Sequence, residues 1–145
     1  MVAMASTAFV ALGVVGLGGG ELAVAASKSP AVTAMVELTK VKVTAGKLVR
    51  GKLVLTNRGS QEVDLNQICA PKWEVVLGKR RTAPPVAFTQ ECGVGSFPVK
   101  PGTTRLPFET STKKLSPGKY RAFLVASDPS FPVAKPVPVT IVAPS

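Results

Sequence analysis

The chain has 145 residues, which is enough for one domain with a single hydrophobic core. It contains no histidine, which excludes catalysis by a nucleophile–histidine pair and excludes imidazole metal ligands. Its 13 glycines, 13 prolines and formal net charge of +10 favour a basic protein built from short strands and turns over a helical one.

The first 26 residues differ from the rest of the chain. Residues 1–20 are uncharged, and residues 23–27 offer the small side chains that are typical of a signal-peptidase site. No Lys or Arg precedes the apolar run, so the basic segment that opens most secretory signals is absent. We expect residues 1–26 to be a signal peptide or apolar leader and residues 27–145 to form the domain. The alternative is an uncleaved segment that anchors the protein, although its apolar run is short and rich in glycine for a spanning helix.

Alternation of apolar and polar residues predicts β-strands along most of the domain. Residues 32–43 form the first predicted strand, with a kink or a switch between sheets near Thr39-Lys40. Six more predicted strands follow, at residues 49–55, 63–68, 73–77, 104–108, 120–126 and 137–143. Pro136 and Pro138 remove hydrogen-bond donors from the last strand, so we expect that strand to have an open edge.

About seven short strands with turn residues between them are typical of an immunoglobulin-like antiparallel β-sandwich. The sequence therefore predicts an all-β fold of this kind. An open Greek-key barrel is the alternative architecture.

The stretch from Cys69 to Cys92 holds both cysteines and the only tryptophan. In an exported protein the two cysteines are expected to form a disulfide with each other. This bond would close the connection beyond the fourth strand, whereas antibody domains join their second and sixth strands. Trp73 is expected to lie in the core, since a buried indole contributes a large apolar area to a small domain.

The densest basic run, Lys79-Arg80-Arg81, lies inside the same stretch. Two prolines follow it, so residues 79–85 are expected to be a loop that the disulfide holds at one end of the sandwich. These three basic side chains are the candidate binding residues. The alternative is that they are simply a solvated loop tip.

Several short motifs resemble those of small secreted immunoglobulin-like domains common in actinobacteria. They are N-x-G (Asn57, Gly59), C-x-x-x-W (Cys69, Trp73), F-x-x-x-C (Phe88, Cys92), P-G-T-T-R (residues 101–105) and L-S-P-G-K-Y-R-A (residues 115–122). The P-G-x-Y element is also similar to that of the intracellular proteinase-inhibitor (BsuPI-type) sandwich family, from which this chain departs by its export and its cysteines. The first resemblance implies the fold. Only the second implies proteinase inhibition.

The residues give little support to catalysis. A disulfide would leave neither sulfur as a nucleophile or ligand, and the spacing of the acids nominates no carboxylate pair. We therefore expect no catalytic residues, no metal site and no cofactor.

We expect a secreted or envelope-associated, non-catalytic binding or structural module that acts as a monomer on a protein or an anionic envelope component. One alternative is a proteinase inhibitor that presents loop 79–85 to a trypsin-like pocket. Another is a basic domain that binds anionic envelope polymers. Nucleic acid is not expected as a partner, because the aromatic residues are not interleaved with the basic ones.

Overall fold

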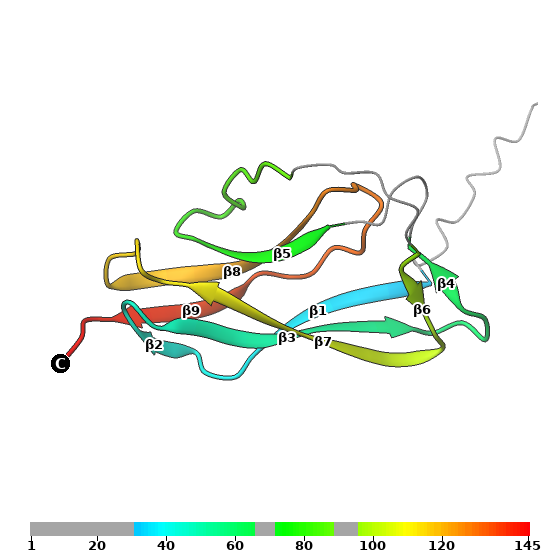
Figure 1. Cartoon of the computed structure of the whole chain (residues 1–145), viewed down its shortest axis with the longest axis horizontal. Coiled ribbons are helices and arrows are strands. Elements are labelled where there is room, and N and C mark those ends of the chain that lie inside the picture. Colours follow the sequence, from blue (N-terminus) through cyan, green and yellow to red (C-terminus); the bar gives the residue numbers. More distant parts are fainter. Residues whose placement is uncertain (1–30, 66–71, 89–95) are drawn as a thin grey trace, which may run out of the picture.

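The computed structural model describes residues 31–65, 72–88 and 96–145 (Figure 1). These residues form an all-β sandwich, as the alternation predicts. The expected leader (residues 1–26), Cys69, Cys92 and their expected disulfide lie outside the described residues. Within the described ranges there is no helix that could span a membrane.

The described residues form nine strands in three sheets. They are β1 (Val32–Leu38), β2 (Lys42–Thr44), β3 (Leu48–Asn57), β4 (Val63–Asp64), β5 (Trp73–Gly78), β6 (Pro98–Val99), β7 (Gly102–Ser111), β8 (Gly118–Ala126) and β9 (Val137–Val142). One sheet has the order β1-β3-β7, the facing sheet has the order β2-β9-β8-β5, and β4 pairs with β6. This strand order matches that of immunoglobulin-like domains. Strands β1, β3 and β7 correspond to strands A, B and E of such domains, and β5, β8 and β9 correspond to strands C, F and G.

The strand count differs from the predicted seven for two reasons. The first predicted strand divides into β1 and β2, which belong to different sheets, so the switch expected near Thr39-Lys40 is confirmed. The short strand β6 was not predicted, because two residues are too few to show an alternating pattern. The pair β4–β6 is extended by a backbone bond from Leu65 N–H to Phe97 O, at 3.0 Å.

The core lies between the two large sheets in three clusters. The buried members are Val32, Leu53, Leu55, Val99 and Phe131 in the first, Val36, Val75, Phe108, Ala122 and Ala134 in the second, and Val43, Val49, Tyr120, Val139 and Ile141 in the third. Trp73 is half-buried and packs against the first and second clusters. The third cluster receives residues from β2, β3, β8 and β9, so it holds both sheets together at one end.

Strand β9 has an open edge along its first half, as its prolines predict. β2 pairs with β9 in parallel, and this pairing covers only Thr140 to Val142. Pro138 lies before that stretch and faces only Arg121 of β8 in the ladder. Because no second strand among the described residues pairs with β9 at Pro138, its missing N–H removes no hydrogen bond on that side.

Candidate functional site

The positive charge of the protein is concentrated at one end of the sandwich, on the left in Figure 1. This end is formed by the crossing from β1 to β2, the β2–β3 turn, the end of β5, the β7–β8 connection and the start of β8. Eleven exposed basic residues lie there: Lys40, Lys42, Lys47, Arg50, Lys79, Arg80, Arg81, Lys113, Lys114, Lys119 and Arg121. We call this set the basic end.

Glu109 is the one acidic residue among the described residues of this end. Its Oε1 accepts a hydrogen bond from Arg50 Nε at 2.7 Å across the β3–β7 pair. The two side chains are 64% and 54% exposed, so water screens their attraction. The end therefore carries a large uncompensated positive charge.

The rest of the described chain is nearly neutral. It holds six basic residues: Lys52, Arg58, Lys72, Lys100, Arg105 and Lys135. It also holds five acidic residues: Glu37, Glu62, Asp64, Glu74 and Asp128. Asp128 accepts from the Ser130 backbone N–H at 2.8 Å and from the Ser130 hydroxyl at 2.7 Å, and these bonds lower its pKa below the usual value. Its carboxylate thus contributes a stable negative charge away from the basic end.

The loop with the candidate residues Lys79, Arg80 and Arg81 folds back over the outer face of β5 and β8 (Figure 1). Phe123 points to this outer face, yet it is only 6% exposed. A Cβ atom added to Gly78 would lie 3.0 Å from Pro84 Cδ and 3.3 Å from the Phe123 ring. Pro84 is therefore packed against the sheet, while the other residues of the loop 79–85 are exposed.

Two of the three candidate residues make specific contacts, Lys79 through its side chain and Arg80 through its backbone. The amino group of Lys79 lies 5.1 Å from the centre of the Tyr120 ring, within the range of a cation–π contact. The Arg80 carbonyl oxygen accepts a long hydrogen bond from Arg121 Nη1 at 3.5 Å. The structure thus brings the predicted basic run next to the start of β8, with Lys119 and Arg121, which the sequence analysis did not include.

Tyr120 and Thr112 fix the shape of this end. The Tyr120 hydroxyl donates to Ser116 O at 2.8 Å, as in the tyrosine corner near the start of strand F of immunoglobulin-like domains. Thr112 is fully buried, and its hydroxyl donates to Lys47 O at 2.6 Å. These bonds tie the β7–β8 connection to itself and to the β2–β3 turn.

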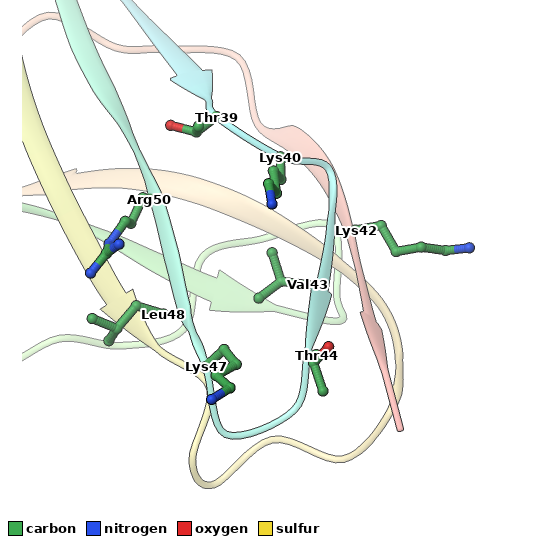
Figure 2. A pocket seen from close by; sticks show the side chains of 8 residues that line it. All are labelled: Thr39, Lys40, Lys42, Val43, Thr44, Lys47, Leu48 and Arg50. Atoms are coloured by element: carbon green, nitrogen blue, oxygen red, sulfur yellow. The ribbon is translucent and has the colours of Figure 1, made fainter. Parts of the chain in front are cut away.

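A hollow of about 310 Å³ opens between β2 and β3 at the basic end (Figure 2). It is lined by Thr39, Lys40, Lys42, Val43, Thr44, Lys47, Leu48 and Arg50. The hollow exists because the chain leaves one sheet after β1, passes through β2 in the other, and returns to the first in β3. One contiguous segment, residues 39–50, therefore frames it.

Backbone hydrogen bonds close both ends of this frame. Thr39 N–H donates to Arg50 O at 2.9 Å on one side, and Lys47 N–H donates to Thr44 O at 3.0 Å on the other. The second bond closes a β-turn whose third residue is Gly46, with a φ of +84°. Type II turns need positive φ at this position, which favours glycine.

The hollow was not predicted from the sequence. The sequence signal for it is the expected sheet switch, together with the spacing of Lys40, Lys42, Lys47 and Arg50 around that switch. Sequence spacing alone does not show which lysines point toward one another. In Figure 2, Lys42 extends away from the other labelled side chains, beyond β2.

Among the described residues there is no group of three or more acidic, histidine or cysteine side chains that could hold a metal ion. The lysine and arginine side chains of the basic end provide hydrogen-bond donors and positive charge. A surface with these properties can bind anions.

No model of a known protein family matches the sequence, and no curated protein matches it significantly. Among solved structures, the chain is similar to an alkylpurine DNA glycosylase from Pseudomonas fluorescens, solved bound to DNA containing an abasic site analogue. That alignment has a TM-score of 0.48 and 8% identity, and it covers 77% of this chain and 30% of the glycosylase chain. This chain thus spans less than a third of the glycosylase chain's length.

The chain is also similar to the CARDB domain of the PF1109 protein from Pyrococcus furiosus, solved in complex with di-metal ions. Here the TM-score is 0.47, the identity is 15%, and the alignment covers 77% of this chain and 87% of the CARDB chain. Neither likeness bears on function.

Proposed function

We propose that this protein is an exported, non-catalytic module that binds an anionic polymer of the cell envelope through its basic end. The observation that carries the proposal is the separation of charge. Eleven basic residues and a single acidic one lie at one end, while the rest of the described chain is nearly balanced. A surface of one sign raises the local concentration of ligands of the other sign and speeds their association.

The distribution of the charge favours a polymer over a small ligand. The basic residues come from five separate segments and cover a whole end of the molecule, so a small anion would meet only a few of them. A polyanion that contacts many of them gains affinity by releasing its bound counterions.

The aromatic residues argue against single-stranded nucleic acid as that polymer. Every aromatic side chain in the described residues is buried or half-buried. Proteins that bind single strands stack bases on exposed aromatic rings in a basic groove. A polymer without bases, such as a phosphate-containing or carboxylate-containing wall glycopolymer, fits this surface better.

The envelope location in this proposal rests on the apolar residues 1–26 and on the expected Cys69–Cys92 bond. Retention of residues 1–26 as an anchor would hold the same domain at the membrane. In either case the basic end faces the extracytoplasmic space, and the module acts as a monomer without a cofactor.

The proteinase-inhibitor alternative receives less support from the geometry. An inhibitor loop must enter the cleft of its proteinase, whereas Pro84 packs beside Gly78 and Phe123 on the sheet, and the Lys79 amino group lies over the Tyr120 ring. An inhibition assay with a trypsin-like proteinase remains the direct check of that alternative.

Two charge-reversal variants with the same net charge test the proposal. Lys113→Glu with Lys119→Glu changes the basic end, and Arg58→Glu with Lys100→Glu changes exposed residues at the opposite end, where β3 ends and β7 begins. Retention on immobilised polyphosphate and on poly-glutamate is measured over a series of salt concentrations. We expect the wild type to be retained, with a steep dependence on salt.

We expect the basic-end variant to lose affinity by about tenfold or more, and the opposite-end variant to change by about threefold or less, because screening limits the influence of distant charges. Equal losses in the two variants would contradict a localised binding surface. Absence of wild-type retention at low salt would contradict polymer binding altogether.

A further inference from the structure

The hollow framed by residues 39–50 is a concave site within the basic end (Figure 2). Its cations come from consecutive pieces of the chain: Lys40 from the crossing, Lys47 from the turn and Arg50 from β3. No carboxylate lines it. Glu109 engages Arg50 through Nε, and the described residues supply no acceptor to the terminal nitrogens of Arg50 or to the two amino groups.

This arrangement attracts one anionic group more strongly than the flat parts of the basic end do. The walls of a concave site exclude part of the water and focus the field of the charges around it. Thr39 and Thr44, whose side chains are neutral and polar, also line the hollow. An anion with several acceptor oxygens would pair with donors from more than one wall.

We propose that the hollow seats one phosphate group of the polymer, an inference that rests on the proposed function. A phosphate presents its oxygens in three dimensions, so donors on different walls can each reach one, whereas a carboxylate presents two oxygens in a single plane. The guanidinium of Arg50 can bind a phosphate through two parallel N–H groups, and each lysine acts as a point charge.

The size of the hollow agrees with a phosphate that belongs to a larger molecule. Its volume of about 310 Å³ corresponds to roughly ten water molecules at about 30 Å³ each. It therefore accommodates the phosphate and part of the unit that carries it. The cations outside the hollow, such as Lys113 and Lys114, can then meet the neighbouring charges of the same polymer.

A membrane surface is a poorer fit than a polymer. Of the large apolar side chains exposed in the described residues, Val41 and Leu48 belong to the segment around the hollow. Helices and loops that enter the membrane interface use a larger apolar surface with aromatic side chains. No aromatic side chain is exposed among the described residues of this end.

The test compares two double variants of the full chain that lose the same charge at the same end. Lys40→Ala with Lys47→Ala removes two cations of the hollow, and Lys113→Ala with Lys114→Ala removes two exposed cations outside it. Calorimetric titration with inorganic pyrophosphate reports on the hollow. Retention on polyphosphate over a salt series reports on the whole basic end.

We expect the hollow variant to bind pyrophosphate about tenfold more weakly or worse, and the control variant to stay within about twofold of the wild type. The plot of log affinity for polyphosphate against log salt concentration has a negative slope. This slope should become shallower by roughly 1–2 in both variants, because each variant loses two charges.

A third variant blocks the hollow without changing the charge. Leu48 lines the hollow and is 39% exposed, so the indole of Leu48→Trp can occupy the hollow without entering the core. We expect this variant to lose pyrophosphate binding while its salt slope on polyphosphate stays unchanged. Thermal unfolding verifies that each variant is folded.

Equal pyrophosphate affinity in the two double variants would overturn the phosphate seat, while wild-type retention on polyphosphate would leave the proposed function intact. Stronger retention on poly-glutamate than on polyphosphate would also overturn it. So would binding to phosphatidylglycerol vesicles without binding to pyrophosphate. If the wild type is retained on no polyanion at low salt, the proposed function and the inference fail together.

Discussion

The two ends of the sandwich are closed by different kinds of interaction. At the opposite end, where β3 ends and β7 begins, closure depends on buried side chains. Asn57 is 2% exposed and donates from Nδ2 to Gln61 O at 2.8 Å and to Val99 O at 2.9 Å. Nearby, the rings of Phe97 and Phe131 meet edge to face, with their centres 5.8 Å apart. Substitutions at this end therefore change the fold itself.

At the basic end, closure depends on backbone groups and on neutral hydroxyls. The carbonyl oxygens of Lys47 and Ser116 accept from Thr112 and Tyr120, and the lysine side chains at this end remain exposed. Apart from Arg50, Lys79 and Arg121, the basic side chains of this end make no contact that closes it among the described residues. These remaining side chains are available for a ligand.

The largest expected effect on stability is at the opposite end. Asn57→Ala removes both donors and also the acceptor of the Gly59 N–H, a bond of 2.9 Å. Buried carbonyl oxygens would lose their partners, so we expect the free energy of unfolding to fall by about 3 kcal/mol. Urea unfolding measures it, with Ser60→Ala in the same exposed turn as the control. A loss below about 1 kcal/mol would contradict the role given to Asn57.

A smaller effect is expected from the hydroxyl at the basic end. Tyr120→Phe keeps the ring in the core and removes only the bond to Ser116 O, so we expect a loss of about 1 kcal/mol. Thermal or urea unfolding measures the loss. Because the exposed lysines are unchanged, retention on polyphosphate should stay within about twofold of the wild type. A large drop in retention would show that binding depends on this anchor after all.

The smallest effect on stability is expected at the ion pair between Arg50 and Glu109, which is the only one among the described residues of the basic end. Here we also expect a gain in binding. Glu109→Gln removes an exposed pair worth about 0.5 kcal/mol or less. It also removes the one acidic residue beside the cations, so we expect polyphosphate affinity to rise about twofold to threefold at low salt. Glu62→Gln is the matched control, since Glu62 is exposed and lies between β3 and β4, away from the basic end. An equal gain in the control would mean that only net charge matters.

Much of the fold was predictable from local patterns. Alternation located the long strands, and the break at Thr39-Lys40 located the switch between sheets. Pro138 correctly indicated an unpaired edge, because a missing donor is tolerated only there. Each of these signals depends on one residue and its immediate neighbours, which the sequence displays directly.

The candidate site was only partly predictable, because it depends on which strand ends meet in space. Lys79-Arg80-Arg81 was predictable as a candidate because it is the densest basic run of the sequence. Lys40 and Lys113 join the same end only through pairing between distant strands, such as Leu48 with Ser111. That register is set by long-range packing, which a local pattern does not contain. The position of the loop against Phe123 is likewise a tertiary contact.

The division of the first strand between two sheets also has a mechanical consequence. The described chain enters β1 at the opposite end and leaves β9 at the basic end (Figure 1). Tension between these points pulls β2 and β9, which run parallel, in opposite directions along their own axes. The ladder from Lys42–Thr140 to Thr44–Val142 then carries the load in shear, with all of its bonds strained together. A domain that is pulled at these two points is thereby loaded along the direction in which its strands resist best.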